Sequence, residues 1–392
     1  MPARLTRLFL GFFDSERASG VILIACTLAS LLLANVLIGP AWIEFWHAKL
    51  PLDIAGVISV NYTLEHWIND GLMTVFFLLI GLEIERELYV GELSNLRNAS
   101  LPIVAAIGGM LTPVLIHFLL NQGTPTQPGI AIPMATDIAF ALGALSLLGR
   151  RVPVSLKIFL TALAIIDDLG AIAVIGIFYS KDFSLPFLLA SLAVFAGLLV
   201  LNRLGVRRLA FYLIPGVLMW YLMGKSGIHA TITGVLLAFA IPFAGGAEGS
   251  PSARLQQFLH RPVAFLIMPL FTLANTGIVL TGDWARGLFS SNGLGIYLGL
   301  VLGKPLGIAL FSLAAVKARL SRLPVDLSWK HVLGGGFLGG IGFTMSIFIT
   351  LLAFADPAIT QASKIAILLA SLTAGVVGIV ILARQPMSVT EE

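Results

Sequence analysis

The chain has 392 residues, of which 58% are apolar and only 11% are Asp, Glu, Lys or Arg. Its mean hydropathy is +0.97. A soluble globular domain carries about 25% charged residues, so this composition excludes a water-exposed globule. The charges are confined to short gaps between apolar runs, which predicts a single polytopic membrane domain over residues 1–392. The only cysteine, Cys26, excludes an internal disulfide bond.

Twelve apolar runs predict an all-α membrane protein with twelve transmembrane helices. Most runs have the ~20 residues that a helix needs to cross a hydrocarbon layer ~30 Å thick. In chain order, the expected spans are Gly20–Ile38, Trp67–Leu82, Leu101–Leu120, Ile130–Leu148, Val154–Tyr179, Pro186–Leu201, Leu209–Met223, Ile228–Ala244, Pro262–Leu280, Leu294–Val316, Val332–Phe354 and Ser363–Ala383.

Basic residues are distributed unevenly over the loops between these spans. Lys and Arg accumulate on the cytoplasmic side of membrane proteins. Counted from the N-terminus, alternate segments hold seventeen Lys and Arg residues, whereas the opposite loops hold only Lys49, Lys181, Lys225, Arg286 and Lys364. This asymmetry predicts that both termini are cytoplasmic and that the number of spans is even.

The loop between the first two spans has a strand-like pattern. Residues Leu52–Leu64 alternate apolar with small or polar side chains, and Gly56 and Asn61 are turn formers. Such alternation is typical of paired β-strands. The segment therefore favours a small β-hairpin on the periplasmic side, with an irregular loop as the alternative.

Four ionisable residues lie at a common depth in the predicted bilayer. Asp137 is near the midpoint of the fourth span, Asp167 and Asp168 are at the midpoint of the fifth, and Lys304 is at the midpoint of the tenth. A charge near the bilayer centre costs at least ~2.5–3.5 kcal/mol, so such residues usually serve function. Three carboxylates and one ammonium predict a cation site with an internal counter-charge. The alternative is an ion-pair network that only holds helices together.

Two of the spans carry residues that interrupt helices. The fourth contains Pro133, which cannot donate to the helix ladder, shortly before Thr136 and Asp137. The eleventh contains six glycines in nine residues, namely Gly334, Gly335, Gly336, Gly339, Gly340 and Gly342. Irregular backbone at this depth is tolerated only where it is buried in protein or lines a watery cavity. We therefore expect two broken helices, whose carbonyls could bind a cation together with Thr136. Close helix packing is the alternative role of the glycines.

The two broken spans are the fourth and the eleventh, seven positions apart in the order of spans, so they run in opposite directions across the membrane. Residues 101–179 and 294–383 would then form two triplets of inverted topology, spans three to five and ten to twelve. Each triplet would have its broken helix in the middle. Interrupted segments in corresponding positions of inverted repeats indicate a transporter site. The pattern predicts a secondary active transporter and not an enzyme.

Seven stretches of the sequence resemble the bacterial NhaA-type sodium/proton antiporters. They are Trp67–Phe77, Gly81–Leu88, Ala131–Gly143, Lys157–Ala173, His229–Gly234, Gly303–Ile308 and Gly339–Phe348. The resemblance implies electrogenic export of Na⁺ or Li⁺ in exchange for more than one H⁺, for cytoplasmic pH and sodium homeostasis. It also implies a location in the bacterial inner membrane and a homodimer, with the Leu52–Leu64 hairpin as the candidate contact. No cofactor and no nucleic-acid partner are expected.

The resemblance also assigns roles to the four deep charges. Asp168 and Asp167 would be the principal carriers of Na⁺, Li⁺ and protons. Asp137 would offset the positive ends of the half-helices, and Lys304 would offset their negative ends and pair with Asp167. Charge counting agrees, because two carboxylates take up two protons whereas one bound Na⁺ leaves a negative charge. The second proton could instead pass to Lys304 when a cation breaks its pair with Asp167.

Members of this family are switched on by alkaline pH through charged groups near the cytoplasmic side. Glu83, Glu87 and His260 match that group, although solvated residues at a helix end are the alternative for the two glutamates. Gln256 and Gln257 stand where the best-studied members have an acid and a histidine. The pH profile is therefore not predicted.

Other readings of the deep charges fit less well. A sodium-coupled solute symporter of related architecture needs polar side chains along a substrate cavity, and few occur beyond Asn275, Thr276 and Ser346. An intramembrane aspartyl protease is disfavoured because neither a Tyr-Asp nor a Gly-x-Gly-Asp motif accompanies the deep aspartates. A channel is disfavoured because a single deep cluster with its own lysine makes a trapping site.

Overall fold

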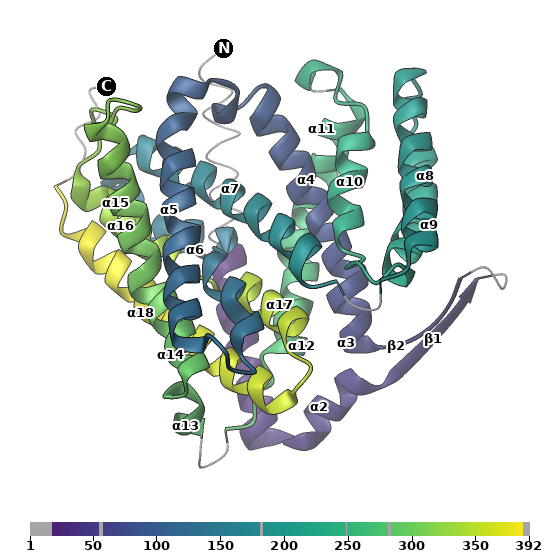
Figure 1. Cartoon of the computed structure of the whole chain (residues 1–392), viewed down its shortest axis with the longest axis horizontal. Coiled ribbons are helices and arrows are strands. Elements are labelled where there is room, and N and C mark those ends of the chain that lie inside the picture. The colour runs from purple at the N-terminus through teal and green to yellow at the C-terminus, as the bar shows by residue number, and fades with distance from the viewer. Residues whose placement is uncertain (1–17, 55–57, 181–182, 248, 281–283, 387–392) are drawn as a thin grey trace. The chain divides into compact units, whose positions relative to one another are not determined.

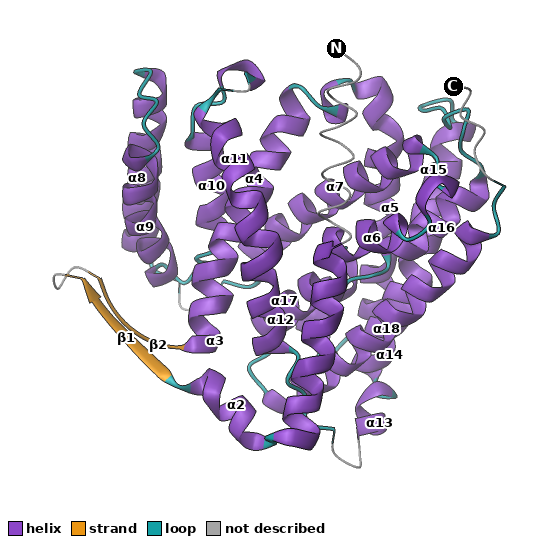
Figure 2. Ribbon diagram, turned by 180° about the vertical axis from the view of Figure 1, so that it is seen from behind, coloured by secondary structure: helices purple, strands orange, loops and turns teal. Residues whose placement is uncertain are grey.

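The computed structural model describes residues 18–54, 58–180, 183–247, 249–280 and 284–386. Gly56 of the predicted turn and both chain ends lie outside these ranges, so the cytoplasmic placement of the termini stays a prediction. Figure 2 shows that the described residues are mostly helical, with one two-stranded sheet among them.

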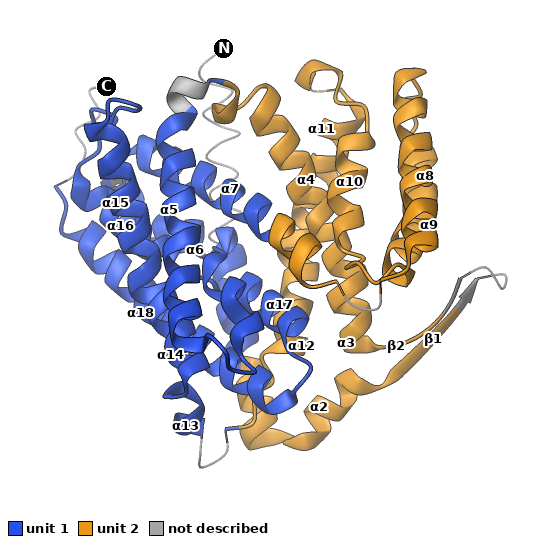
Figure 3. Cartoon of the chain, in the orientation of Figure 1, with its two compact units in different colours: residues 1–28, 95–171, 280–392 blue, residues 29–94, 172–279 orange. Residues whose placement is uncertain are grey.

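The chain forms two compact units (Figure 3). Unit 1 comprises residues 1–28, 95–171 and 280–392, and unit 2 comprises residues 29–94 and 172–279. Unit 1 therefore holds nearly all residues of the two predicted triplets. Their inverted relation stays a prediction.

Unit 1 is a helical bundle with two interrupted segments (Figure 1). Its first half contains α5 (Leu96–Asn121), the 3₁₀ helix η4 (Gln127–Met134), α6 (Ile138–Ser146), the short η5 (Gly149–Arg151) and most of α7 (Val154–Phe178). Its second half contains α13 (Trp284–Leu288), α14 (Ser291–Leu298), the π-helical turn η8 (Gly299–Gly303), α15 (Lys304–Lys317), α16 (Trp329–Gly339), α17 (Phe343–Ala353) and α18 (Pro357–Ala383).

Unit 2 combines helices with the sheet. Before α7 it contains the π-helical turn η1 (Leu33–Leu37), α2 (Pro40–His47), β1 (Lys49–Ile54), β2 (Ile58–Thr63), α3 (Leu64–His66), η2 (Trp67–Leu72), α4 (Met73–Tyr89) and η3 (Glu92–Ser94). After α7 it contains α8 (Leu185–Arg203), α9 (Ala210–Lys225), α10 (Ile232–Ala240), η6 (Ala244–Gly246), α11 (Pro251–Pro262), η7 (Val263–Ile267) and α12 (Met268–Asn275).

The predicted hairpin is confirmed. Strands β1 and β2 pair antiparallel, with Lys49 opposite Thr63 and Ile54 opposite Ile58. The first strand begins at Lys49, three residues before the predicted segment and two residues after the end of α2 at His47. Figure 1 shows the hairpin between α2 and α3.

Nine helices in the described residues are long and apolar enough to cross a membrane, and the bent pair α16–α17 could be a tenth. The predicted seventh and eighth spans correspond to the shorter helices α9 and α10. The count of twelve therefore stays a prediction. Several spans are longer than expected; the second, for example, forms a continuous helix over Leu64–Tyr89. Hydropathy marks only the apolar part of a helix, whereas the polar ends continue it.

Helices α5 and α15 cross closely next to Lys304. A Cβ atom added to Gly307 would collide with the carbonyl oxygen of Gly108, so the two helices touch backbone to backbone. One turn earlier, Lys304 begins α15 immediately after the π-helical turn η8. A Cβ atom on Gly109 would lie 3.9 Å from the Lys304 Cγ atom. That is ordinary van der Waals contact, whereas the same Cβ atom would lie only 2.8 Å from the Ile308 side chain, so the glycines of α5 serve the close approach of the two helices.

Candidate cation and proton site

The fourth predicted span is interrupted between η4 and α6. Pro133 lies in the last turn of η4, and residues 135–137 are not helical. Ala135 and Asp137 have extended backbone angles, and α6 begins at Ile138. The predicted break is thus present, two to four residues beyond the proline.

The eleventh predicted span is interrupted between α16 and α17, which bend by 45° at this point. Of the glycines expected here, Gly339 ends α16, whereas Gly340 and Gly342 lie in the break. The backbone N–H of Asp137 donates a hydrogen bond of 2.7 Å to the carbonyl of Ile341. The two breaks are therefore in direct main-chain contact within unit 1.

Asp137 caps the start of a half-helix on each side of this contact. Its Oδ1 atom accepts a hydrogen bond from the Phe140 N–H of α6 at 3.1 Å. Its Oδ2 atom accepts bonds from both the backbone N–H and the hydroxyl of Thr344, in the first turn of α17. Helix N-termini carry partial positive charge. A single carboxylate, 1% exposed, thus faces two positive helix ends.

Lys304 joins a carboxylate and the end of a half-helix. Its Nζ atom lies 2.8 Å from Asp167 Oδ2, and both side chains are 0% exposed. The same ammonium donates a hydrogen bond to the carbonyl of Met134, the last residue of η4. Helix C-termini carry partial negative charge. Lys304 therefore lies between two negative groups, one formal and one partial.

Thr136 lies between Asp167 and the second break. Its Oγ1 atom is 2.7 Å from Asp167 Oδ2 and 2.9 Å from the carbonyl oxygen of Gly339. A hydroxyl carries one proton, so it can donate fully to only one of these oxygens at a time. Ser346 on α17 donates to the Ile132 carbonyl at 2.7 Å. Side chains thus donate to at least one carbonyl in each interrupted span.

Asp167 and Asp168 are neighbours on α7 and are 0% and 1% exposed. The Oδ1 atom of Asp167 accepts no hydrogen bond within the described part of the chain. Carboxylate, hydroxyl and carbonyl oxygens are the ligands that hard cations prefer. Across the described ranges, no group of three or more His, Cys, Asp or Glu side chains is arranged to hold a metal ion. Neutral oxygens would have to complete a site for Na⁺ or Li⁺.

Three of the four deep charges fall into two contact sets, and Asp168 lies beside Asp167 on α7. Asp167, Lys304 and Thr136 form one, and Asp137 with Thr344 forms the other. Sequence reasoning did not identify Thr344 as the partner of Asp137. The sequence feature that could have indicated this pair is the hydroxyl two residues after Gly342, where the second half-helix begins.

The residues expected to respond to pH lie on two helices of unit 2. Glu83 and Glu87 are on α4, and His260 is on α11, which packs against α4. Gln256 lies close to the Glu83 side chain, and Glu87 forms a 3.0 Å ion pair with Arg86. The structure thus brings this group onto neighbouring helices. A role in pH response stays a prediction.

Sequence reasoning missed a buried acid in the same helix pair. Glu85 is only 5% exposed, and the hydroxyl of Ser252 on α11 donates to its Oε2 atom at 3.2 Å. The pattern of alternating Glu and apolar residues at the end of α4 gave no indication which acid points inward.

Comparison with known proteins identifies the family. A sequence model of the Na⁺/H⁺ antiporter 1 family matches residues 11–382. The chain belongs to this family. The Na⁺/H⁺ antiporter NhaA of Dechloromonas aromatica is 62% identical over 96% of this chain and 95% of its own length. The NhaA proteins of Flavobacterium psychrophilum, at 58% identity, and Escherichia coli O1:K1, at 47%, align over 96% and 94% of this chain and 95% of their own lengths. The resemblance read from the motifs is confirmed, and the chain is a multi-pass membrane protein of the NhaA family.

Proposed function

We propose that this protein exchanges Na⁺ or Li⁺ for more than one H⁺ across the bacterial inner membrane, and so regulates cytoplasmic sodium and pH. The observation that carries the proposal is the buried pair of Asp167 and Lys304, next to Asp168, where two broken helices meet. Relatives that cover nearly the whole chain are named Na⁺/H⁺ antiporters, which supports the same activity here.

The carboxylates of Asp167 and Asp168 are the proposed carriers. A Na⁺ ion would bind their oxygens, with Thr136 as a neutral ligand, since Thr136 already lies 2.7 Å from Asp167. Protons bind the same carboxylate oxygens and therefore compete with Na⁺. Competition of this kind produces exchange if the site opens to one side of the membrane at a time.

Lys304 couples cation binding to proton release. Its ammonium occupies Asp167 Oδ2, so Na⁺ must displace it to use that oxygen. The displaced ammonium keeps the Met134 carbonyl as an acceptor but loses its counter-charge, which favours release of its proton. Asp168 would release the other proton directly. Two protons would then leave for each Na⁺ bound.

This stoichiometry moves one net charge in each cycle. A net charge that crosses the membrane is worth ~2.3 kcal/mol per 100 mV. A potential that is negative inside would therefore favour proton entry and Na⁺ exit. Asp137 takes no proton in this scheme, because its carboxylate keeps both half-helix N-termini neutralised in every state.

Symport of Na⁺ with a solute is the alternative function. The residues that could line a solute cavity already form hydrogen bonds within the protein, which favours exchange. Asn275 hydrogen-bonds to Asn69 and to the Phe271 carbonyl. Thr276 donates to the carbonyl one turn earlier, and Ser346 donates across the first break. These polar groups are hydrogen-bonded within the protein, so they leave few donors and acceptors for a solute.

A homodimer formed through the hairpin completes the proposal, with both termini in the cytoplasm. A two-stranded sheet leaves the outer edge of each strand without a strand partner, and exposed edges pair readily with other chains. Deletion of residues 51–61 should shift the protein from dimer to monomer in native mass spectrometry. A dimer that persists unchanged would assign the contact to another surface.

Exchange can be measured directly in proteoliposomes. We expect Na⁺ and Li⁺, but not K⁺, to collapse an imposed pH gradient, and an imposed membrane potential to change the rate. Asp168→Asn should abolish exchange, whereas the matched change Asp326→Asn, at an exposed loop position of unit 1, should leave it intact. Full exchange by Asp168→Asn would overturn the site assignment, and a rate independent of potential would overturn the electrogenic stoichiometry.

A further inference from the structure

Two helices in the described part of the chain contain a π-helical turn just before a proline. In unit 1, η8 is followed by Lys304 and Pro305. In unit 2, η7 is followed in the same way by Met268 and Pro269. In each helix, the residue before the proline donates its backbone N–H to the carbonyl five residues earlier. The repeated pattern indicates that the proline favours the turn.

A proline disturbs an α-helix in two ways. It has no N–H to donate, and its ring collides with the carbonyl of the residue four positions earlier. For Pro305 that residue is Val301, which lies inside η8. A π turn takes up one residue more than an α turn and thereby moves this carbonyl away from the ring. Pro305 therefore explains the π turn, and replacing it should return the segment to an α-helix.

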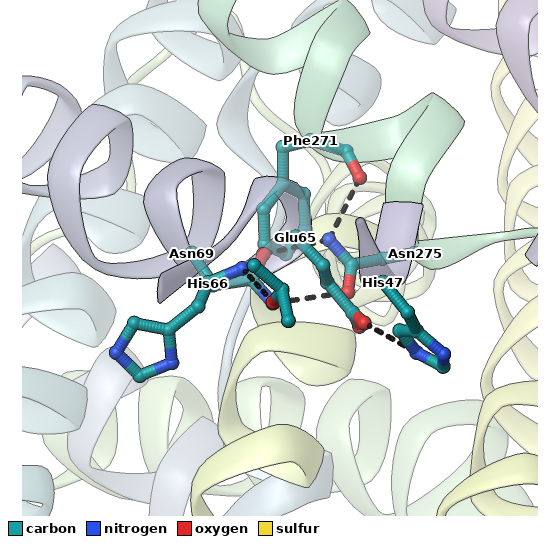
Figure 4. A network of polar contacts seen from close by, with 7 residues as sticks. His47, Glu65, His66, Asn69, Phe271 and Asn275 are labelled. Atoms are coloured by element: carbon teal, nitrogen blue, oxygen red, sulfur yellow. Dashed lines mark hydrogen bonds and ion pairs between the residues drawn. The ribbon is translucent and has the colours of Figure 1, made fainter. Parts of the chain in front are cut away.

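The π-helical turn η2 of unit 2 has a different cause. Thr74, not a proline, is the second residue after this turn. Asn69 lies in η2 and exchanges side-chain hydrogen bonds with Asn275, the last residue of α12, as Figure 4 shows. Asn275 also donates to the Phe271 carbonyl at 2.9 Å. Side chains of another helix thus hold η2, whereas the proline accounts for η8.

The helices on both sides of η8 are held by separate contacts. On α14, Asn292 Oδ1 lies 3.2 Å from His117 Nε2 of α5, and the Asn292 amide donates to Ser363 of α18 at 2.8 Å. On α15, Gly307 packs against Gly108 of α5. The extra residue of η8 turns α15 by about 100° relative to α14. The turn therefore allows both sets of contacts to form at once.

The turn also packs against both interrupted spans. A Cβ atom on Gly299, the first residue of η8, would lie 2.7 Å from Pro133 Cβ in η4. A Cβ atom on Gly340, in the second break, would collide with the carbonyl oxygen of Leu300 in η8. The turn is thus part of the packing around the candidate cation site.

Lys304 is the first residue after the turn, and its ammonium reaches both Asp167 and the Met134 carbonyl. A rotation of about 100° would carry this side chain away from both groups. We propose that Pro305 is a positioning residue, which enforces η8 and so directs Lys304 to Asp167. The inference rests on the proposed function, in which Na⁺ displaces Lys304 from Asp167. Pro305 thereby sets how strongly the ammonium competes with Na⁺.

The test is the Na⁺ affinity of the purified full-length protein, measured by calorimetry at alkaline pH. Pro305→Ala supplies the missing N–H. We expect this variant to bind Na⁺ about tenfold more tightly, because an ammonium that no longer reaches Asp167 does not have to be displaced. General damage to the site would weaken binding instead. Pro305→Ser also supplies an N–H and should bind in the same way, which keeps the test open if the alanine variant does not fold.

Two further variants show whether the effect passes through the lysine. Lys304→Gln removes the ammonium itself, so adding Pro305→Ala to it should change Na⁺ affinity no further. Pro269→Ala is the matched control, because Pro269 follows η7 in the same way but is preceded by the uncharged Met268. It should bind Na⁺ as the unchanged protein does.

Three results would overturn the proposal. They are equal or weaker Na⁺ binding by Pro305→Ala, the same tightening by Pro269→Ala, and a further tightening when Pro305→Ala is added to Lys304→Gln. Absence of Na⁺ binding by the unchanged protein would instead contradict the proposed function. Thermal unfolding of each variant, measured in the same detergent, separates a change in binding from loss of the fold.

Discussion

The backbone N–H of Asp137 donates a hydrogen bond of 2.7 Å to the Ile341 carbonyl, and this bond joins the breaks of two helices. The carboxylate of Asp137 accepts hydrogen bonds from the N-termini of α6 and α17. Lys304 and Thr136 donate hydrogen bonds to the carbonyls at the C-terminal ends of η4 and α16. Four half-helix ends are thus compensated within one unit, which allows irregular backbone to persist at membrane depth.

Breaking the buried ion pair should destabilise the protein strongly. Lys304→Met leaves the Asp167 carboxylate without its counter-charge, and removal of one partner from a buried pair costs ~3–5 kcal/mol. We expect a marked fall in the thermal unfolding temperature at alkaline pH. The double variant Lys304→Met, Asp167→Asn should recover most of the loss, because no isolated charge remains. Equal instability of the single and double variants would contradict this account.

Asp137 should matter more to stability than an ordinary helix cap. Asp137→Ala removes a cap from both α6 and α17, and each lost cap costs ~0.5–2 kcal/mol. Asp137→Asn keeps one carbonyl oxygen as an acceptor and should lose less. The control is Asp356→Ala, because Asp356 caps only α18. Equal unfolding temperatures for the alanine variants at positions 137 and 356 would argue against the double cap.

The α5–α15 crossing should not tolerate a methyl group. Gly307→Ala would push against the Gly108 carbonyl, and overpacking of this kind costs ~1–3 kcal/mol. Gly197→Ala in α8 is the matched control, since a Cβ there meets nothing within 4 Å. It should be neutral or stabilising, because alanine favours helices. Scanning fluorimetry of both variants checks the prediction, and tolerance of Gly307→Ala would show that the helices can move apart cheaply.

The buried glutamate of unit 2 should depend on its hydroxyl partner. Ser252→Ala removes the hydroxyl that donates to Glu85 Oε2, and an unsatisfied buried polar group costs ~1–3 kcal/mol. Glu85→Gln keeps an acceptor for the Ser252 hydroxyl and should be nearly neutral. Ser94→Ala, at an exposed hydroxyl of the same unit, is the control. If Ser252→Ala unfolds at the same temperature as Ser94→Ala, the contact contributes no stability.

Sequence patterns predicted the two breaks, because a break depends on local composition, whereas the depth of the charges in the bilayer stays a prediction. Apolar runs locate the hydrocarbon layer, and Pro133 and the glycines mark where a helix fails. Composition alone did not predict which aspartate meets Lys304; the family resemblance implied Asp167, and the structure shows that pair. Asp167 and Asp168 are only about 100° apart around α7, and the rotation of a helix is set by packing against other segments. The pairs that Asp137 forms with Thr344, and Glu85 with Ser252, depend on the same long-range packing.

Na⁺ binding to the purified protein over a series of pH values tests the central claim most directly, which is that Na⁺ and protons compete for Asp167 and Asp168. Calorimetry in buffers of different ionisation enthalpy gives both the affinity and the number of protons released. The account predicts that the affinity falls as the pH is lowered, that more than one proton leaves for each Na⁺, and that Asp168→Asn does not bind. Na⁺ affinity that is independent of pH, with no proton release, would contradict it.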